Sequence, residues 1–465
     1  MRALPLILTG LISASVFTAA CGSVDVPQAS TGTSGGVGGA GGADPTTSAT
    51  TGNTTSTGDS ASSSAATTGS SGTGGGGGGI DIGQPSDVYP AKHAAAPKLV
   101  TYGGPILNAP KVYPVFFKDD KPTIVNSVTD FYNKIGTSDY WKATVAEYGV
   151  GPLSSGAPIQ LTDVADTAPA STTDDEIQAW LAAKLNNDDM AFPTPDANTI
   201  IALNYPVGTS IDLQGSKSCG SFLGYHSNLT LNAAHGNMDV AYIVIPRCTM
   251  QQTGMNELDA ITDTGAHELV EASTDPYPQT NGAYGQVDNN HIYWLFALGG
   301  GENGDMCAQN YDASYNDPQI GYVVQRAWSN KAAGASHDPC VPAAAGPYFN
   351  SAPLLNDTIT IGGGGQSIKV KGIQIPVGST KAVEIDLFSD AKTSGPWQVE
   401  AHDLNEFMGG APTLKFAFDA TSGQNGQKLH LSITPTKSNQ YKSEVFFVVS
   451  TLGNQHSSWI GIVGN

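Results

Sequence analysis

Residues 267–271 read HELVE and place a histidine and two glutamates at a spacing that suits a metal site. Residues four positions apart share one face of an α-helix, so His267 and Glu271 can ligate one ion while Glu268 lies beside them. This is the HExxH zinc motif with glutamate as its second ligand, and Zn²⁺ accepts both imidazole nitrogen and carboxylate oxygen. We predict that His267 and Glu271 are metal ligands and that Glu268 is the catalytic base. The alternative is a histidine packed in the core beside two solvated glutamates.

The third metal ligand must come from another part of the chain. Residues 302–307 read ENGDMC, where Glu302 and Asp305 adjoin a cysteine expected to form a disulfide. A loop anchored in this way can hold a carboxylate in place, so both residues are candidate ligands of equal rank. The alternative is a polar turn after a strand near residues 292–297. His291 is a weaker candidate, because a lone histidine after two asparagines is typical of an exposed turn.

Several motifs between about residues 100 and 342 resemble, in type and order, those of the EXORDIUM, or phosphate-induced protein 1, family of extracellular proteins. They are GGP at 103–105, CG at 219–220, GYHS at 224–227, PRC at 246–248, HELVE at 267–271, ENGDMC at 302–307 and DPC at 338–340. The resemblance implies an extracellular location and a zincin-like helix, whereas the family has no securely established enzymatic activity. Asn303 stands where the family pattern predicts an aliphatic residue.

The first 88 residues have the composition of an export signal followed by a spacer. Residues 1–21 contain Arg2, a short apolar run and the sequence TAAC, which resembles a bacterial lipoprotein signal with Cys21 as the lipidated residue. The alternative is an ordinary signal peptide with a chance cysteine. Residues 22–88 lack lysine, arginine and aromatic side chains, which predicts a disordered tether. We therefore expect an exported protein that is lipid-anchored to the membrane at the bacterial cell envelope, or else secreted.

The four remaining cysteines suggest two disulfides, as expected of an exported chain. Three pairings are open, and we favour the pairs nearest in sequence, Cys219 with Cys248 and Cys307 with Cys340. A zinc site of four cysteines is disfavoured, because the closely spaced cysteine pairs of such sites are absent from the sequence.

The pattern of apolar residues predicts an α+β protein with two folded domains. Residues 97–342 should form a zincin-like domain with a mixed sheet, and residues 346–465 an all-β, Ig-like sandwich. In the first domain we expect strands at 112–117, 199–203 and 240–245, and helices at 124–135, from a capping box at Thr173 and Glu176, and at 257–273. In the second we expect strands that include 368–371, 382–387 and 445–449.

The net charge is −20, from 21 Lys+Arg and 41 Asp+Glu, which argues against nucleic acid as a partner. The sequence favours a surface-tethered hydrolase of the zinc metallopeptidase type, with a peptide or a cell-surface polymer as substrate. A ligand set of one histidine and two carboxylates lowers the Lewis acidity of the ion, so other divalent cations compete with zinc. The alternative is a non-catalytic binding or adhesion protein whose metal site is structural or vestigial. His226, Tyr284, Tyr293 and Trp294 could line a cleft, although their types are more typical of ordinary packing.

Overall fold

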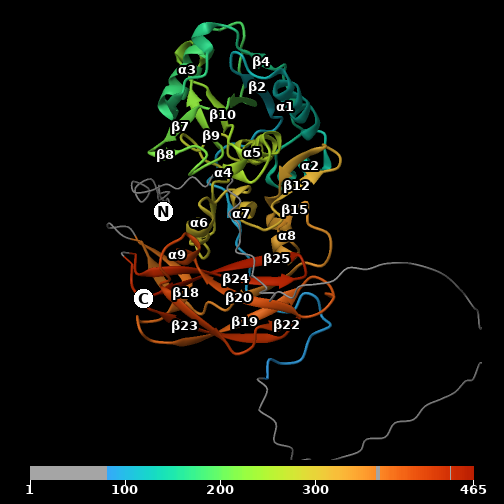
Figure 1. Cartoon of the computed structure of the whole chain (residues 1–465), viewed down its shortest axis with the longest axis vertical. Helices are drawn as coiled ribbons and strands as arrows, with labels where there is room; N and C mark the ends of the chain where they lie inside the picture. Colours follow the sequence, from blue (N-terminus) through green and yellow to red (C-terminus); the bar gives the residue numbers. More distant parts are fainter. Residues whose placement is uncertain (1–80, 363–366, 440) are drawn as a thin grey trace, which may run out of the picture. The chain divides into compact units, whose positions relative to one another are not determined.

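The computed structural model describes residues 81–362, 367–439 and 441–465 and has a mixed α+β architecture rich in strands (Figure 1). The expected signal peptide, the lipidation site Cys21 and residues 22–80 of the expected spacer lie outside the described residues. Within the described ranges, no helix has the length and apolar character needed to span a bilayer.

A six-stranded sheet forms the centre of the first part of the fold. Its order is β3-β2-β6-β10-β9, with β4 also paired to β2. Strands β2, β6 and β10 are parallel, whereas β9 runs antiparallel to β10 at the edge. The bounds are β2 Lys111–Phe116, β3 Ser154–Ser155, β4 Ile159–Gln160, β6 Thr199–Tyr205, β9 Tyr225–Thr230 and β10 Asp239–Pro246. The three strands expected from their apolar runs are therefore confirmed, each to within two residues.

Helices cover both faces of this sheet. Side chains alternate along a strand, so Ile200 and Ala202 pack on one face and Ile201 and Leu203 on the other. The first face packs against α1 (Pro122–Ile135), α2 (Asp139–Val145) and α5 (Glu257–Thr274), and the second against α3 (Asp174–Asn186). The predicted capping box at the start of α3 is present, with both of its hydrogen bonds formed.

Helix α5, which carries HELVE, is buried along most of its length. Asn256 caps its start by accepting hydrogen bonds from the amides of Leu258 and Asp259. Every residue from Ala260 to Thr274 is buried, and Pro276 follows soon after the helix ends. The expected range of 257–273 is thus confirmed, and α5 provides a rigid support for the residues of the motif.

Short elements surround α5 and complete this part of the fold. They are β1 Leu99–Val100, β5 Ser171–Thr173, β7 Ser210–Leu213, β8 Ser216–Lys217, α4 Met250–Thr253, β11 Gln286–Val287, α6 Trp294–Leu298, α7 Asp305–Ala308, β12 Ser314–Asp317, β13 Tyr322–Gln325, β14 Ala327–Trp328, α8 Asn330–Gly334 and β15 Cys340–Val341. The strand expected near residues 292–297 is wrong, because the segment forms α6. Trp294 and Leu298 are buried one helical turn apart, and Gly299 ends the helix at φ 82°.

Both predicted disulfides are confirmed. Cys219 joins Cys248 and Cys307 joins Cys340, with Cα atoms 5.3 and 5.7 Å apart. The second disulfide ties α7 to β15 and so anchors the segment that carries Glu302 and Asp305.

The C-terminal part is a β-sandwich, as expected. One sheet has the order β16-β19-β23-β21 and the other β17-β18-β25-β24-β20-β22. Inward side chains of both sheets share one apolar core, which includes Trp397 and Phe446. The bounds are β16 Phe349–Pro353, β17 Asp357–Ile361, β18 Ile368–Gln374, β19 Lys381–Ser389, β20 Trp397–Asp403, α9 Leu404–Phe407, β21 Leu414–Phe418, β22 Ser422–Gly423, β23 Lys428–Pro435, β24 Ser443–Leu452 and β25 Gln455–Gly464.

The expected end of the spacer at residue 88 is wrong, because residues 82–88 contact the sandwich. The Ser86 amide donates a hydrogen bond to the Asn425 carbonyl, and the Asn425 side chain donates to the carbonyls of Ser86 and Val88. The Lys428 amide likewise donates to the Ile82 carbonyl. This segment lacks lysine, arginine and aromatic residues, but its backbone is held by hydrogen bonds that composition alone does not reveal.

Candidate metal centre

Seven acidic and histidine side chains from three regions of the fold converge beside α5. Helix α5 supplies His267, Glu268 and Glu271, and Asp275 follows its last turn. The loop after α6 supplies Glu302, the first residue of α7 supplies Asp305, and edge strand β9 supplies His226. We call the carboxylates of Glu268, Glu271, Asp275, Glu302 and Asp305 the acidic cluster.

Glu271 lies at the centre of this arrangement. Its Oε2 is 3.1 Å from Nε2 of His267, one helical turn away, and 3.6 Å from Nδ1 of His226. Its Oε1 accepts a hydrogen bond of 3.0 Å from the backbone amide of Asp305. One oxygen is therefore fixed by the backbone, while the other is directed toward the two imidazoles. The convergence of His267 and Glu271 is the geometry expected from the HELVE spacing.

Glu302 and Asp305 both reach the cluster, but on different sides of Glu271. Asp305 Oδ1 lies 3.8 Å from Nε2 of His267, and its Oδ2 accepts a hydrogen bond from the Glu302 amide. Glu302 Oε2 lies 3.4 Å from Nε2 of His226. The choice that the sequence left open is therefore resolved into two places: Asp305 faces His267 and Glu302 faces His226.

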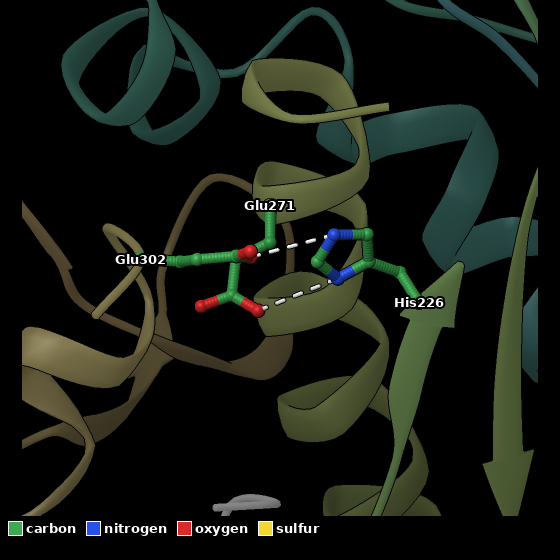
Figure 2. Close-up of side chains that lie close together, drawn as sticks. All are labelled: His226, Glu271 and Glu302. Atoms are coloured by element: carbon green, nitrogen blue, oxygen red, sulfur yellow. Dashed lines mark ion pairs between the residues drawn. The ribbon is translucent and has the colours of Figure 1, made fainter. Parts of the chain in front are cut away.

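His226 is the residue that the sequence did not identify as a ligand. Figure 2 shows the carboxylates of Glu271 and Glu302 on the same side of its ring, with one ring nitrogen paired to each. Its Nδ1 is also 3.6 Å from Oε2 of Glu268. In the part of the chain that the structure describes, neither His226 Nε2 nor Glu302 Oε2 has a hydrogen-bond partner, although both atoms are buried. The GYHS motif at 224–227 contains this histidine, but the motif alone does not show that His226 lies near α5. That proximity depends on how β9 pairs within the sheet.

The other candidate residues lie outside the cluster. His291 Nδ1 is 2.9 Å from a carboxylate oxygen of Asp288 in a separate turn. Tyr293 and Trp294 are buried in an apolar core, and Tyr284 packs against it. Trp294 also lines a cavity of about 320 Å³ whose lining includes no residue of the acidic cluster. Asn303, where an aliphatic residue was expected, is buried, and its Oδ1 accepts a hydrogen bond from the Thr274 hydroxyl.

Four glycines allow the backbone to approach the acidic side chains closely. A Cβ on Gly304 would lie 2.7 Å from Glu271 Oε1 and 2.8 Å from His267 Nδ1. A Cβ on Gly224 would lie 2.8 Å from Glu268 Oε1. A Cβ on Gly285 would likewise lie too close to the carboxylate of Asp275, and a Cβ on Gly300 too close to that of Asp305. The loops around α5 therefore depend on glycine to enclose the cluster.

Burial and mutual repulsion raise the pKa of several of these carboxyl groups. Burial raises the pKa of Glu302 well above its usual range, and the charges of Glu271 and Asp275 raise it further. Burial also raises the pKa of Asp305 strongly, with Glu271 adding to the effect. Burial would raise the pKa of Glu271 too, but the neighbouring His267 outweighs it and the net shift is downward. Glu271 is thus the carboxylate best suited to remain ionised.

The base candidate Glu268 and its neighbour His226 show related shifts. Burial raises the pKa of Glu268 despite the opposing effect of His226. Burial lowers the pKa of His226, but Glu268 and Glu271 outweigh it, so the net shift is upward. Within the described part of the chain, the ion-pair partners of the acidic cluster are the two histidines, and no lysine or arginine is among them.

The donor set fits a divalent metal ion. Zinc bonds of about 2.0–2.2 Å at tetrahedral angles place neighbouring ligand atoms roughly 3.3–3.6 Å apart. The distances of 3.1 Å between His267 Nε2 and Glu271 Oε2 and of 3.4 Å between His226 Nε2 and Glu302 Oε2 are close to this range. Two overlapping groups have ligand atoms within 4.8 Å of one another: His267, Glu268 and Glu271, and His226, Glu271 and Glu302.

A glutamine on the far side of His267 holds that ring in place. Nε2 of Gln325 lies 2.9 Å from Nδ1 of His267 and donates a hydrogen bond of 2.9 Å to the Gly304 carbonyl. Because the contacting atom of Gln325 is an amide nitrogen, Nδ1 of His267 accepts here, whereas ligand histidines in metal sites usually donate from this nitrogen to an oxygen. Strand β13, which ends at Gln325, packs directly on α5.

Comparisons with known proteins identify no relative of this chain. No protein-family model and no curated protein matches it. The similar solved structures include domains 4 and 5 of the S-layer protein SbsC, with a TM-score of 0.16, 13% identity and coverage of 30% of this chain and 89% of that one. The titin M3 domain has a TM-score of 0.14, 11% identity and coverage of 20% and 85%. TM-scores this low do not establish a shared fold. The resemblance to the EXORDIUM family stays a prediction.

Proposed function

We propose that the acidic cluster binds a divalent metal ion, with zinc the first candidate, and that the protein is an exported metal-dependent hydrolase of zincin-like type. The observation that carries this proposal is the pair His267 Nε2 and Glu271 Oε2, 3.1 Å apart on a buried helix in a cluster of five carboxylates. A helix with these residues packed on a mixed sheet is the arrangement expected of a zincin-like domain.

His267, Glu271 and Asp305 would hold the ion, and Glu268 would act as the general base. A bound zinc ion lowers the pKa of a water molecule and polarises a substrate carbonyl. The carboxylate of Glu268 would accept the proton of the attacking water and pass it to the leaving amine.

The two disulfides and the expected export signal support a substrate outside the cytosol. Two disulfides are typical of a chain that folds in an oxidising compartment. A lipid on Cys21 would tether the protein to the membrane of the cell envelope, so a peptide or another cell-surface polymer would be the substrate. The C-terminal sandwich would serve as an Ig-like binding module, by analogy of fold alone.

A second candidate function is a non-catalytic surface protein with a structural metal ion. The observation that favours it is burial: His267, Glu268 and Glu271 are only 2–4% exposed. Two cavities of about 320 and 210 Å³ are lined by residues outside the acidic cluster. The lining of the smaller one includes Thr264 and Gln325, which lie beside the cluster.

The substitution Glu268→Gln separates these two functions. In a hydrolase, it abolishes cleavage of a fluorescent peptide library by the Zn²⁺-loaded full-length protein and leaves the zinc content unchanged. The matched control is Glu257→Gln in the first turn of the same helix, which breaks an ion pair with Lys121 away from the cluster and should keep both properties. A zinc-loaded wild type that cleaves nothing would favour the structural role, and a wild type that binds no metal would reject both.

A further inference from the structure

The side of the cluster nearest the solvent contains a second set of ligand atoms. The side chains of His226 and Glu302 are 7 and 15% exposed, against 1 and 5% for His267 and Glu271. Figure 2 shows His226 Nε2 directed at the Glu302 carboxylate. The nitrogen lies 3.4 Å from Glu302 Oε2, and neither atom finds a hydrogen-bond partner among the described residues. Buried polar atoms without a hydrogen bond need an explanation, and a cation held by the lone pairs of this nitrogen and this oxygen supplies one.

The other nitrogen of His226 has a role of its own. Nδ1 lies 3.6 Å from carboxylate oxygens of both Glu268 and Glu271. When a carboxylate attracts a proton to one ring nitrogen, the lone pair of the other nitrogen is left to bind a metal ion. The surroundings of His226 therefore favour ligation through Nε2, toward Glu302.

The charge of the cluster points the same way. The cluster holds five carboxyl groups, and the described ion pairs provide only histidines to compensate their charge. Each carboxylate that ionises in this largely dry region is costly unless a cation pairs with it. A second divalent ion would therefore stabilise the ionised form of carboxyl groups that a first ion leaves unpaired. Glu271 belongs to both groups of ligand atoms, so it is placed to serve both ions.

We propose that His226 and Glu302, together with Glu271, bind a second divalent cation, so that the cluster is a two-metal centre. This inference rests on the proposed function, because it requires the first ion at His267 and Glu271. A donor set of one imidazole and two carboxylates suits Zn²⁺ or Mn²⁺. In two-metal hydrolases the ions lie about 3.5–4 Å apart and act together on the attacking and leaving groups.

The number of bound ions tests this inference. Isothermal titration of the metal-free full-length protein with Zn²⁺, checked by elemental analysis, should give two equivalents for the wild type. His226→Asn and Glu302→Gln should each reduce the number to one, with the free energy of unfolding measured to show that the variants fold. His291→Asn, which removes a histidine outside the cluster, should retain two equivalents.

The outcomes separate the inference from the proposed function. One equivalent in the wild type would overturn the two-metal centre and leave the proposed function intact. Two equivalents that persist in both folded variants would also overturn it, because the second ion would then lie elsewhere. A wild type that binds no zinc would reject the proposed function itself.

Discussion

Replacing Gly304 with alanine should disturb the metal centre through a single methyl group. Gly304 has φ −70° and ψ −49°, a conformation that alanine adopts freely, so the substitution introduces no backbone strain. The new Cβ would lie 2.7 Å from Glu271 Oε1, 2.8 Å from His267 Nδ1 and 2.9 Å from His267 Cε1. The neighbouring atoms must move by several tenths of an ångström, because ordinary contacts of this kind exceed 3.4 Å.

The cost has two parts. Overpacking of a buried site by one methyl group costs about 1–3 kcal/mol. The displacement also affects the hydrogen bond from the Asp305 amide to Glu271 Oε1, and bonds to charged groups contribute about 1.5–3 kcal/mol when intact. We expect the free energy of unfolding of the metal-free protein to fall by about 2 kcal/mol, and zinc affinity to fall about 10–100-fold, as for other changes that disorient a ligand.

Urea unfolding and zinc titration measure these two effects. Gly334→Ala is the matched control, because no atom lies within 4 Å of a Cβ at this position at the end of α8. That variant should be as stable as the wild type or up to about 1 kcal/mol more stable, with unchanged zinc affinity. If Gly304→Ala behaves like Gly334→Ala, the close packing of the loop against Glu271 and His267 is refuted.

Two further predictions concern the surroundings of the centre. Burial raises the pKa of Asp263 from 3.8 to about 6, so the folded state binds its proton more tightly and loses stability as the pH rises from about 4 to about 6. Asp263→Asn should therefore raise the free energy of unfolding by up to about 3 kcal/mol at pH 8 and leave it unchanged at pH 4. The exposed control Asp87→Asn should change the free energy of unfolding at neither pH. An equal effect of Asp263→Asn at both pH values would contradict the prediction. Replacing Cys307 and Cys340 with serine removes a disulfide between residues 33 positions apart in the sequence. The free energy of unfolding, measured with urea, should fall by about 3–4 kcal/mol. The same change should weaken zinc binding because it releases α7, and unchanged affinity would show that the disulfide does not position Asp305.

Local signals in the sequence were sufficient for the helix that carries the site. Asn256 and Pro276 bracket α5, and the HELVE spacing places His267 and Glu271 on one face whatever the helix packs against. The disulfides followed from the even number of cysteines and their closeness in sequence. Such features depend on residues near one another along the chain, which is why they could be predicted.

Features that depend on distant pairing could not be predicted. His226 reaches the cluster because β9 pairs antiparallel with β10 and lies beside α5, and no local pattern specifies that register. The positions of Glu302 and Asp305 depend on the close approach of Gly304 to α5, which separates two carboxylates that looked equivalent. The segment of α6 was misassigned because a short apolar run fits a buried strand and a buried helix equally well.

If Glu271 holds a metal ion in this cluster, its replacement should empty the site. The zinc content of the full-length protein after saturation and dialysis, compared between the wild type and Glu271→Gln, measures this directly. We expect the wild type to retain zinc in stoichiometric amounts and the folded variant to retain almost none, because Glu271 belongs to both groups of ligand atoms. A folded Glu271→Gln protein that keeps as much zinc as the wild type would contradict it.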